Sequence, residues 1–182
     1  MFIPQKPCSA HWRKAVLLRG SIPLSQRHWL LERASLTEKL AAHAKGDLKV
    51  VVLHQQIQRP LYCEARKLRI PHDARALVRE VALLGCGTPW VYARTIIPLT
   101  SLKGSLKRLR YLGSRSLGSA LFADPNLQRG ELQLAPIDTD YLPSSPLLAH
   151  AQPAWGRRSV FTLKSKPLLV TEVFLESLWN NH

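Results

Sequence analysis

The sequence has few acidic residues and no long apolar run. Its 182 residues include 12 Asp and Glu against 26 Lys and Arg, so the formal net charge is +14. A membrane-spanning helix needs about 18 consecutive apolar residues, and no window of the sequence offers them. We therefore expect no membrane contact. We expect an anionic partner, either a nucleic acid or a small anionic substrate that a positive field attracts.

Cysteine is also scarce. The three cysteines, Cys8, Cys63 and Cys86, form no CxxC pair, which argues against a disulfide scaffold and against a structural zinc site. The first basic residues are followed only by the short apolar run of residues 15–18, which is too short for the core of a signal peptide. These features predict a cytoplasmic protein with free thiols.

The rest of the composition is ordinary for a globular protein, with 46% hydrophobic and 21% charged residues. A chain of this length fits one domain. It buries about 70% of its unfolded surface, which is enough for a core and an internal pocket. We therefore expect residues 1–182 to form a single domain.

Hydrophobic periodicity predicts a pair of helices followed by a sheet. Ser35 and Glu38 have the spacing of a capping box, which indicates that a helix begins there. The predicted helices span 25–33, 36–45, 105–112 and 116–122, and the predicted strands span 48–58, 74–84, 90–97, 131–134, 157–163 and 167–175. The turn residues of 85–89 and of 164–166 predict that the strands on either side of each turn form a hairpin. Residues 1–20 read as irregular, and residues 136–154, with four prolines, read as a loop. The expected class is α+β, with a mostly antiparallel sheet of about six strands.

Three charged residues interrupt apolar faces of these strands. Arg79 and Arg94 each lie in an apolar row, and Glu172 is the only charge in the last strand. A charge on such a face is costly unless it is paired or functional. In one interpretation Arg79 and Glu172 face solvent or form a structural ion pair. In the other they belong to a pocket, where the arginine fork holds a carboxylate and the glutamate handles a hydroxyl or a proton.

Four blocks of the sequence resemble the bacterial chorismate lyase family, in the family's order. They are Trp29-Leu-Leu-Glu with Ser35-Leu-Thr, Leu77-Val-Arg-Glu-Val-Ala-Leu-Leu with Pro89-Trp and Ala93-Arg-Thr-Ile-Ile-Pro, Leu112-Gly with Ser116-Leu-Gly-Ser-Ala-Leu-Phe, and Trp155-Gly-Arg-Arg-Ser with Lys166-Pro-Leu-Leu-Val-Thr-Glu-Val-Phe-Leu. Together they cover roughly residues 25–175. Each block is moderately specific, and the four together are a strong match.

The resemblance implies a lyase that converts chorismate into 4-hydroxybenzoate and pyruvate without a cofactor or metal, the first committed step toward ubiquinone. It also implies an antiparallel sheet with helices that form flaps over a buried site. By position in the motifs, Arg79 would bind the ring carboxylate and Glu172 would meet the ring hydroxyl. The backbone of Leu117 and Leu36 would assist, although another family member has methionine at the position of Leu36.

Several roles stay open on the sequence alone. Glu172 could donate a proton or only orient the hydroxyl. Arg94 could support the site from outside the first layer, meet a second carboxylate, or pair with Glu172. Arg157 and Arg158 could line the entrance or start an exposed hairpin. The segment 135–154 is longer and richer in proline than in the family, which leaves its effect on access to the site open.

Two other functions compete with the lyase. One is a non-catalytic domain that binds a small aromatic acid, related to the effector domains of transcription regulators. Residues 1–24 are too short for the helix-turn-helix that such regulators carry. The other is nucleic-acid binding, for which the short basic helix at 105–112 offers only Tyr111 as an aromatic. We therefore expect a monomer that binds chorismate and 4-hydroxybenzoate and no specific nucleic acid.

Overall fold

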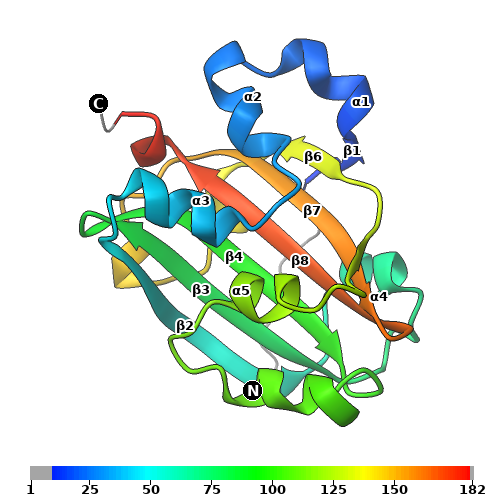
Figure 1. The fold of residues 1–182 in the computed structure, drawn as a ribbon. Coiled ribbons are helices and arrows are strands. Elements are labelled where there is room, and N and C mark those ends of the chain that lie inside the picture. Colours follow the sequence, from blue (N-terminus) through cyan, green and yellow to red (C-terminus); the bar gives the residue numbers. More distant parts are fainter. Residues whose placement is uncertain (1–9, 181–182) are drawn as a thin grey trace.

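The computed structural model describes residues 10–180, and an antiparallel sheet of eight strands forms its centre (Figure 1). The strands are β1 (Arg13–Lys14), β2 (Leu48–Gln58), β3 (Ala76–Gly85), β4 (Thr88–Pro98), β5 (Gln128–Arg129), β6 (Gln133–Pro136), β7 (Pro153–Leu163) and β8 (Lys166–Leu175). Their order across the sheet is β1-β6-β7-β8-β4-β3-β2, and β5 pairs with β7 beside this path. The α+β class and the antiparallel sheet are confirmed; β1 and β5, of two residues each, were not predicted.

Two tight hairpins join the long central strands. The turn between β3 and β4 places Cys86 at φ 50° and Gly87 at φ 78°, and the turn between β7 and β8 places Lys164 at φ 50° and Ser165 at φ 60°. Consecutive left-handed residues match the right-handed twist of the flanking strands. Both hairpins were predicted from the sequence, and they set the register that places the charged residues of the sheet.

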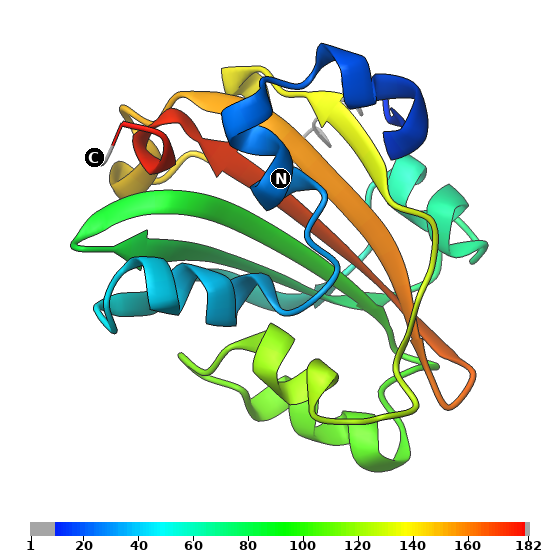
Figure 2. The same cartoon turned by 45° about the horizontal axis from the view of Figure 1, so that its top comes forward.

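Helices cover both faces of the sheet. They are α1 (Ala15–Leu18), α2 (Leu24–Leu30), α3 (Leu36–His43), α4 (Tyr62–Leu68) and α5 (Leu117–Phe122), with 3-10 turns η1 (Arg19–Ser21), η2 (Gly104–Tyr111), η3 (Thr139–Tyr141), η4 (Pro146–Leu148) and η5 (Glu176–Leu178). Figure 2 shows α3, α5 and η2 on the same side of the sheet. On the opposite face Leu68 of α4 packs against Val78 and Leu169. Because both faces of β3 are covered, nearly all of its residues are buried, and apolar and polar residues alternate only weakly along it.

The segment 135–154 is not a loose loop. Its side chains Ile137, Leu142 and Leu148 are buried in a cluster with Ala82 and Val173, on the sheet face opposite α3 and α5. The prolines therefore belong to a segment that follows the back of the sheet. The expectation of irregular structure over residues 1–20 is wrong from residue 13 onward, where β1, α1 and η1 occur; residues 1–9 lie outside the described part.

The cysteine prediction needs one correction. Cys86 is a free, exposed thiol, as expected, but Cys63 is disulfide-bonded. Three isolated cysteines carry no spacing signal, so the sequence could not show which of them meets another in space. Cys8 lies outside the described residues.

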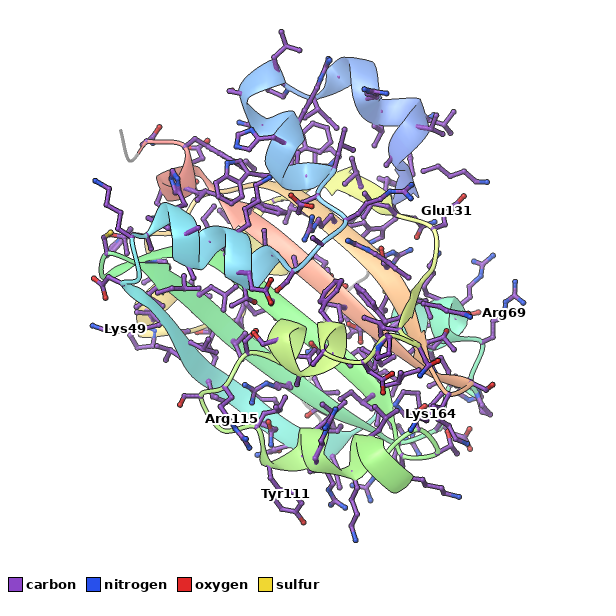
Figure 3. The ribbon with its side chains drawn as sticks, in the orientation of Figure 1. Lys49, Arg69, Tyr111, Arg115, Glu131 and Lys164 are labelled. Atoms are coloured by element: carbon purple, nitrogen blue, oxygen red, sulfur yellow. The ribbon has the colours of Figure 1, made fainter. Side chains whose placement is uncertain are left out.

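Many of the basic side chains lie at the surface of the molecule and not in its core. The side chains of Lys49, Arg69 and Lys164 extend outward from the rim of the molecule (Figure 3). None of the described helices is both long and apolar enough to cross a membrane.

Candidate active site

A partly enclosed cavity lies between the sheet and the starts of α3 and α5. Strands β3, β4, β7 and β8 form its floor, and the two helix starts form its cover. The residues Leu36, Arg79, Leu117 and Glu172 all line this cavity. The structure therefore brings together four positions that are separated by up to 136 residues in the chain.

Arg79 lies on the floor of the cavity and is 2% exposed. Its Nη1 donates to Oε1 of Gln55 at 2.7 Å, and its Nη2 donates to the carbonyls of Gly113 at 2.7 Å and Arg115 at 3.3 Å. These acceptors are all neutral, so they orient the guanidinium without cancelling its charge. Burial lowers the pKa of Arg79 from its ordinary value. Gln55, on the neighbouring strand β2, is a positioning residue that the sequence analysis missed.

Glu172 forms an ion pair inside the cavity with Arg157, whose Nε lies 2.6 Å from Oε2. The Arg157 side chain is 1% exposed and that of Glu172 is 16% exposed. Arg157 also donates from Nη1 to the carbonyls of Trp29 and Glu32, both at 2.9 Å, at the end of α2. The partner of Glu172 is thus neither Arg79 nor Arg94. Arg157 is a buried wall of the cavity and not the exposed start of a hairpin.

Arg94 does not support the cavity, and this expectation is corrected. Side chains alternate along a strand, and Ala93 and Thr95 line the cavity while Arg94 points to the opposite face. There its Nε lies 2.7 Å from Oε1 of Glu64 and its Nη1 lies 2.7 Å from Oε1 of Glu80. Arg94 therefore belongs to a buried structural network on the back of the sheet.

Arg158 also lies on the back of the sheet. Its guanidinium lies 4.6 Å from the ring centroid of Trp12, and its Nε donates to Gln133 at 2.9 Å. Adjacent arginines on β7 thus serve different faces, because side chains alternate along the strand. Of the two, only Arg157 is placed to meet a ligand in this cavity.

Arg129 is a cavity residue that the sequence analysis did not single out. Its Nε donates to Oγ of Ser159 at 3.1 Å, and its Nη1 donates to the carbonyls of Glu32 at 2.9 Å and Arg33 at 3.2 Å. Burial, together with the nearby charge of Arg157, lowers its pKa to about 10. Arg129 lies in a stretch without periodicity, so no local pattern pointed to it.

The cover of the cavity consists of two capped helix starts that bond to each other. Ser35 accepts from the amide of Glu38 at 3.4 Å, and Ser116 accepts from the amide of Ser119 at 3.2 Å. The Ser116 hydroxyl also donates to Oγ1 of Thr37 at 2.9 Å, which joins the two helices. Leu36 and Leu117 are the first residues of α3 and α5. Amides in a first helical turn have no acceptor within their helix, so they are available to an anion.

The cavity is cationic and otherwise mainly apolar. Its charged lining residues are Arg79, Arg129, Arg157 and Glu172, which give three positive charges and one negative charge, a net of +2. Apolar side chains such as Val81, Phe161 and Val170 complete the wall. Within residues 10–180 no group of three or more His, Cys, Asp and Glu is placed to hold a metal ion. The fold and the cavity define an α+β protein with a partly enclosed cationic cavity, which is the candidate ligand site.

Comparison with known proteins places the chain in a family. The family model "Chorismate lyase" matches residues 6–182. A protein of Pseudomonas aeruginosa (strain UCBPP-PA14) named "Probable chorismate pyruvate-lyase" is 37% identical over 174 residues, which cover 96% of each chain. A protein of Methylobacillus flagellatus with the same name is 39% identical over 156 residues, covering 84% of this chain and 87% of the other. The protein belongs to the chorismate lyase family.

Solved structures share the fold at low sequence identity. The effector domain of PhnF from Mycobacterium smegmatis has a TM-score of 0.53 and 16% identity, and the similarity covers 79% of this chain and 90% of that domain. The effector-binding domain of the trehalose repressor of B. subtilis has a TM-score of 0.50 and 12% identity, covering 69% and 89%. At such identities the likeness concerns the fold alone.

Proposed function

We propose that the protein is a chorismate lyase, which converts chorismate into 4-hydroxybenzoate and pyruvate at the start of ubiquinone biosynthesis. The single observation that carries this proposal is that Arg79 and Glu172 line the same partly enclosed cavity in a member of this family. They lie on β3 and β8, which flank β4. Arg79 pairs with Thr95 and Glu172 with Ala93, so two strand spacings across the sheet and an offset of two residues along it separate their backbones by about 12 Å.

For this reaction the protein must mainly bind the charged groups of the substrate and exclude water; it need not supply a chemical reagent. The bond between the ring and the enolpyruvyl oxygen breaks, and the ring carbon that bears the hydroxyl loses its proton. The released electron pair completes the aromatic ring, and enolpyruvate takes up a proton to become pyruvate. Aromatisation drives the reaction, so the protein contributes mainly by holding the dianion in a reactive pose.

Each candidate site residue has a role in this proposal. Arg79 binds the ring carboxylate with a fork that its neutral partners have already oriented. The backbone amides of Leu36 and Leu117 bind the same carboxylate from the cover. Glu172, held as the carboxylate partner of Arg157, accepts a hydrogen bond from the ring hydroxyl. This pairing favours an orienting role for Glu172 over that of a proton donor.

We further propose that residues 1–182 act as one catalytic domain, as a cytoplasmic monomer that needs no metal or cofactor. The experiment is to incubate the purified full chain with chorismate in excess chelator and to follow both products. We expect 4-hydroxybenzoate and pyruvate in equal amounts. Loss of activity in chelator, restored by a divalent ion, would overturn the metal-free proposal. Tight binding of 4-hydroxybenzoate with no turnover would instead favour a non-catalytic domain of the effector type.

A further inference from the structure

The charges of the cavity are only partly matched by the protein itself. Arg157 has a carboxylate partner in Glu172. Within residues 10–180, the hydrogen bonds of Arg79 and Arg129 reach only neutral oxygens. Neither guanidinium therefore forms a direct ion pair with a carboxylate among these residues, and Glu172 and Glu32 attract Arg129 only from a longer range. The proposed substrate has two carboxylates, of which Arg79 accounts for one.

Arg129 is held in a fixed position beside the Arg157–Glu172 pair. It pairs with Phe161 in the register between β5 and β7, and its guanidinium carbon lies 5.2 Å from the centroid of that ring. Its bonds to Ser159 and to the carbonyls of Glu32 and Arg33 use Nε and Nη1. The Nη2 group takes no part in these bonds, so the fork has a donor left for a ligand.

Arg129 also occupies the boundary between the cavity and the surface. It lines both this cavity and a more open cleft whose wall includes the basic residues Lys14, Arg19 and Arg33. Burial and the charge of Arg157 lower the pKa of Arg129 by more than its attraction to Glu172 and Glu32 raises it, so its positive charge is held at a cost. An anion bound between Arg129 and Arg157 would relieve this repulsion.

We propose that Arg129 binds the carboxylate of the enolpyruvyl group of chorismate, and so distinguishes the substrate from the aromatic product. This inference rests on the proposed lyase function. In it the ring lies between Arg79 and Glu172, and the enolpyruvyl group, attached to the ring carbon next to the hydroxyl, extends from Glu172 toward Arg129. The product 4-hydroxybenzoate lacks this second carboxylate and makes no use of Arg129.

The test compares substrate and product in the same variants. We expect Arg129→Gln to lower kcat/KM for chorismate by about ten- to a hundredfold, the effect of one charge-assisted hydrogen bond. We expect the Kd of 4-hydroxybenzoate to change by less than about threefold, because the product lacks the second carboxylate and loses no contact with Arg129. Arg79→Gln should weaken both ligands. Arg158→Gln, an arginine of β7 that faces the back of the sheet, is the matched control and should change neither.

Three results decide between the alternatives. If Arg129→Gln weakens 4-hydroxybenzoate as much as it lowers kcat/KM for chorismate, Arg129 only supports the cavity wall and the proposal is overturned. If Arg129→Gln fails to fold, Arg129→Lys replaces it; a selective loss for chorismate supports the proposal, and equal losses overturn it. If the wild-type protein does not turn over chorismate, the lyase function itself fails, and this is seen before any variant is compared.

Discussion

The substitution Glu172→Gln tests the function and the ion pair together. It keeps the shape of the side chain but removes its negative charge. The side-chain amide that replaces the carboxylate accepts a weaker hydrogen bond from the ring hydroxyl. It also changes the electrostatic environment of the chorismate dianion. We expect turnover to fall by about a hundredfold or more, the usual scale for a group that assists at the reacting centre.

The structure adds a cost in stability. Arg157 is 1% exposed and its Nε lies 2.6 Å from Glu172. Breaking a buried pair completely costs about 3–5 kcal/mol. In Glu172→Gln the amide oxygen still accepts from Arg157, and the carbonyls of Trp29 and Glu32 remain as acceptors. We therefore expect a smaller loss of about 1–3 kcal/mol in the free energy of unfolding. For a chain of this size that lowers Tm by roughly 2–12 °C.

The assay measures Tm and turnover on one preparation and expresses the rate per folded molecule. Glu80→Gln is the matched control. Glu80 pairs with buried Arg94 at 2.7 Å on the back of the sheet, so its loss costs stability without reaching the cavity. The control should melt lower and keep its rate per folded molecule. If Glu172→Gln behaves in the same way, the Arg157–Glu172 pair is structural and the assigned role of Glu172 is refuted.

Further outcomes test other parts of the site. Arg79→Ala should reduce substrate affinity by about ten- to a hundredfold, and Arg79→Lys should recover only part of it because the fork is lost; unchanged kinetics in Arg79→Ala would contradict the carboxylate assignment. Gln55→Leu should raise KM, since Arg79 loses the 2.7 Å bond that orients it, while Tm reports any general damage. Saturation with 4-hydroxybenzoate at about 100 times its Kd should stabilise the fold by about 2.7 kcal/mol; a Tm that ignores the product would argue against a cavity shaped for it. Hydrogen bonds from the backbone of Ala34 and from Lys39 lower the pKa of Glu32 from 4.5 to about 2. A lowered carboxyl pKa stabilises the fold above pH 4.5, and this contribution is lost as the pH falls toward 2; Glu32→Gln should therefore lose less stability than the wild type across that range.

The sequence by itself determined the local elements and the residues that break their patterns. Strand-length apolar segments and turn residues predicted the hairpins of β3–β4 and β7–β8, because both signals depend on neighbours along the chain. The capping box at Ser35 predicted the start of α3 for the same reason. The sequence also singled out Arg79 and Glu172, because a charge in an apolar row of a strand is costly unless it is paired or functional.

Only the tertiary structure decided which charges meet. Alternation placed Arg94 and its neighbours on opposite sides of β4, but it did not say which side is closed by α3 and α5. The pairing of Glu172 with Arg157 depends on the register between β7 and β8. Arg129 reaches the cavity through a strand of two residues, too short to leave a pattern. Backbone periodicity is a local property, whereas the partner of a buried charge is set by strand register and by the segments that cover each face.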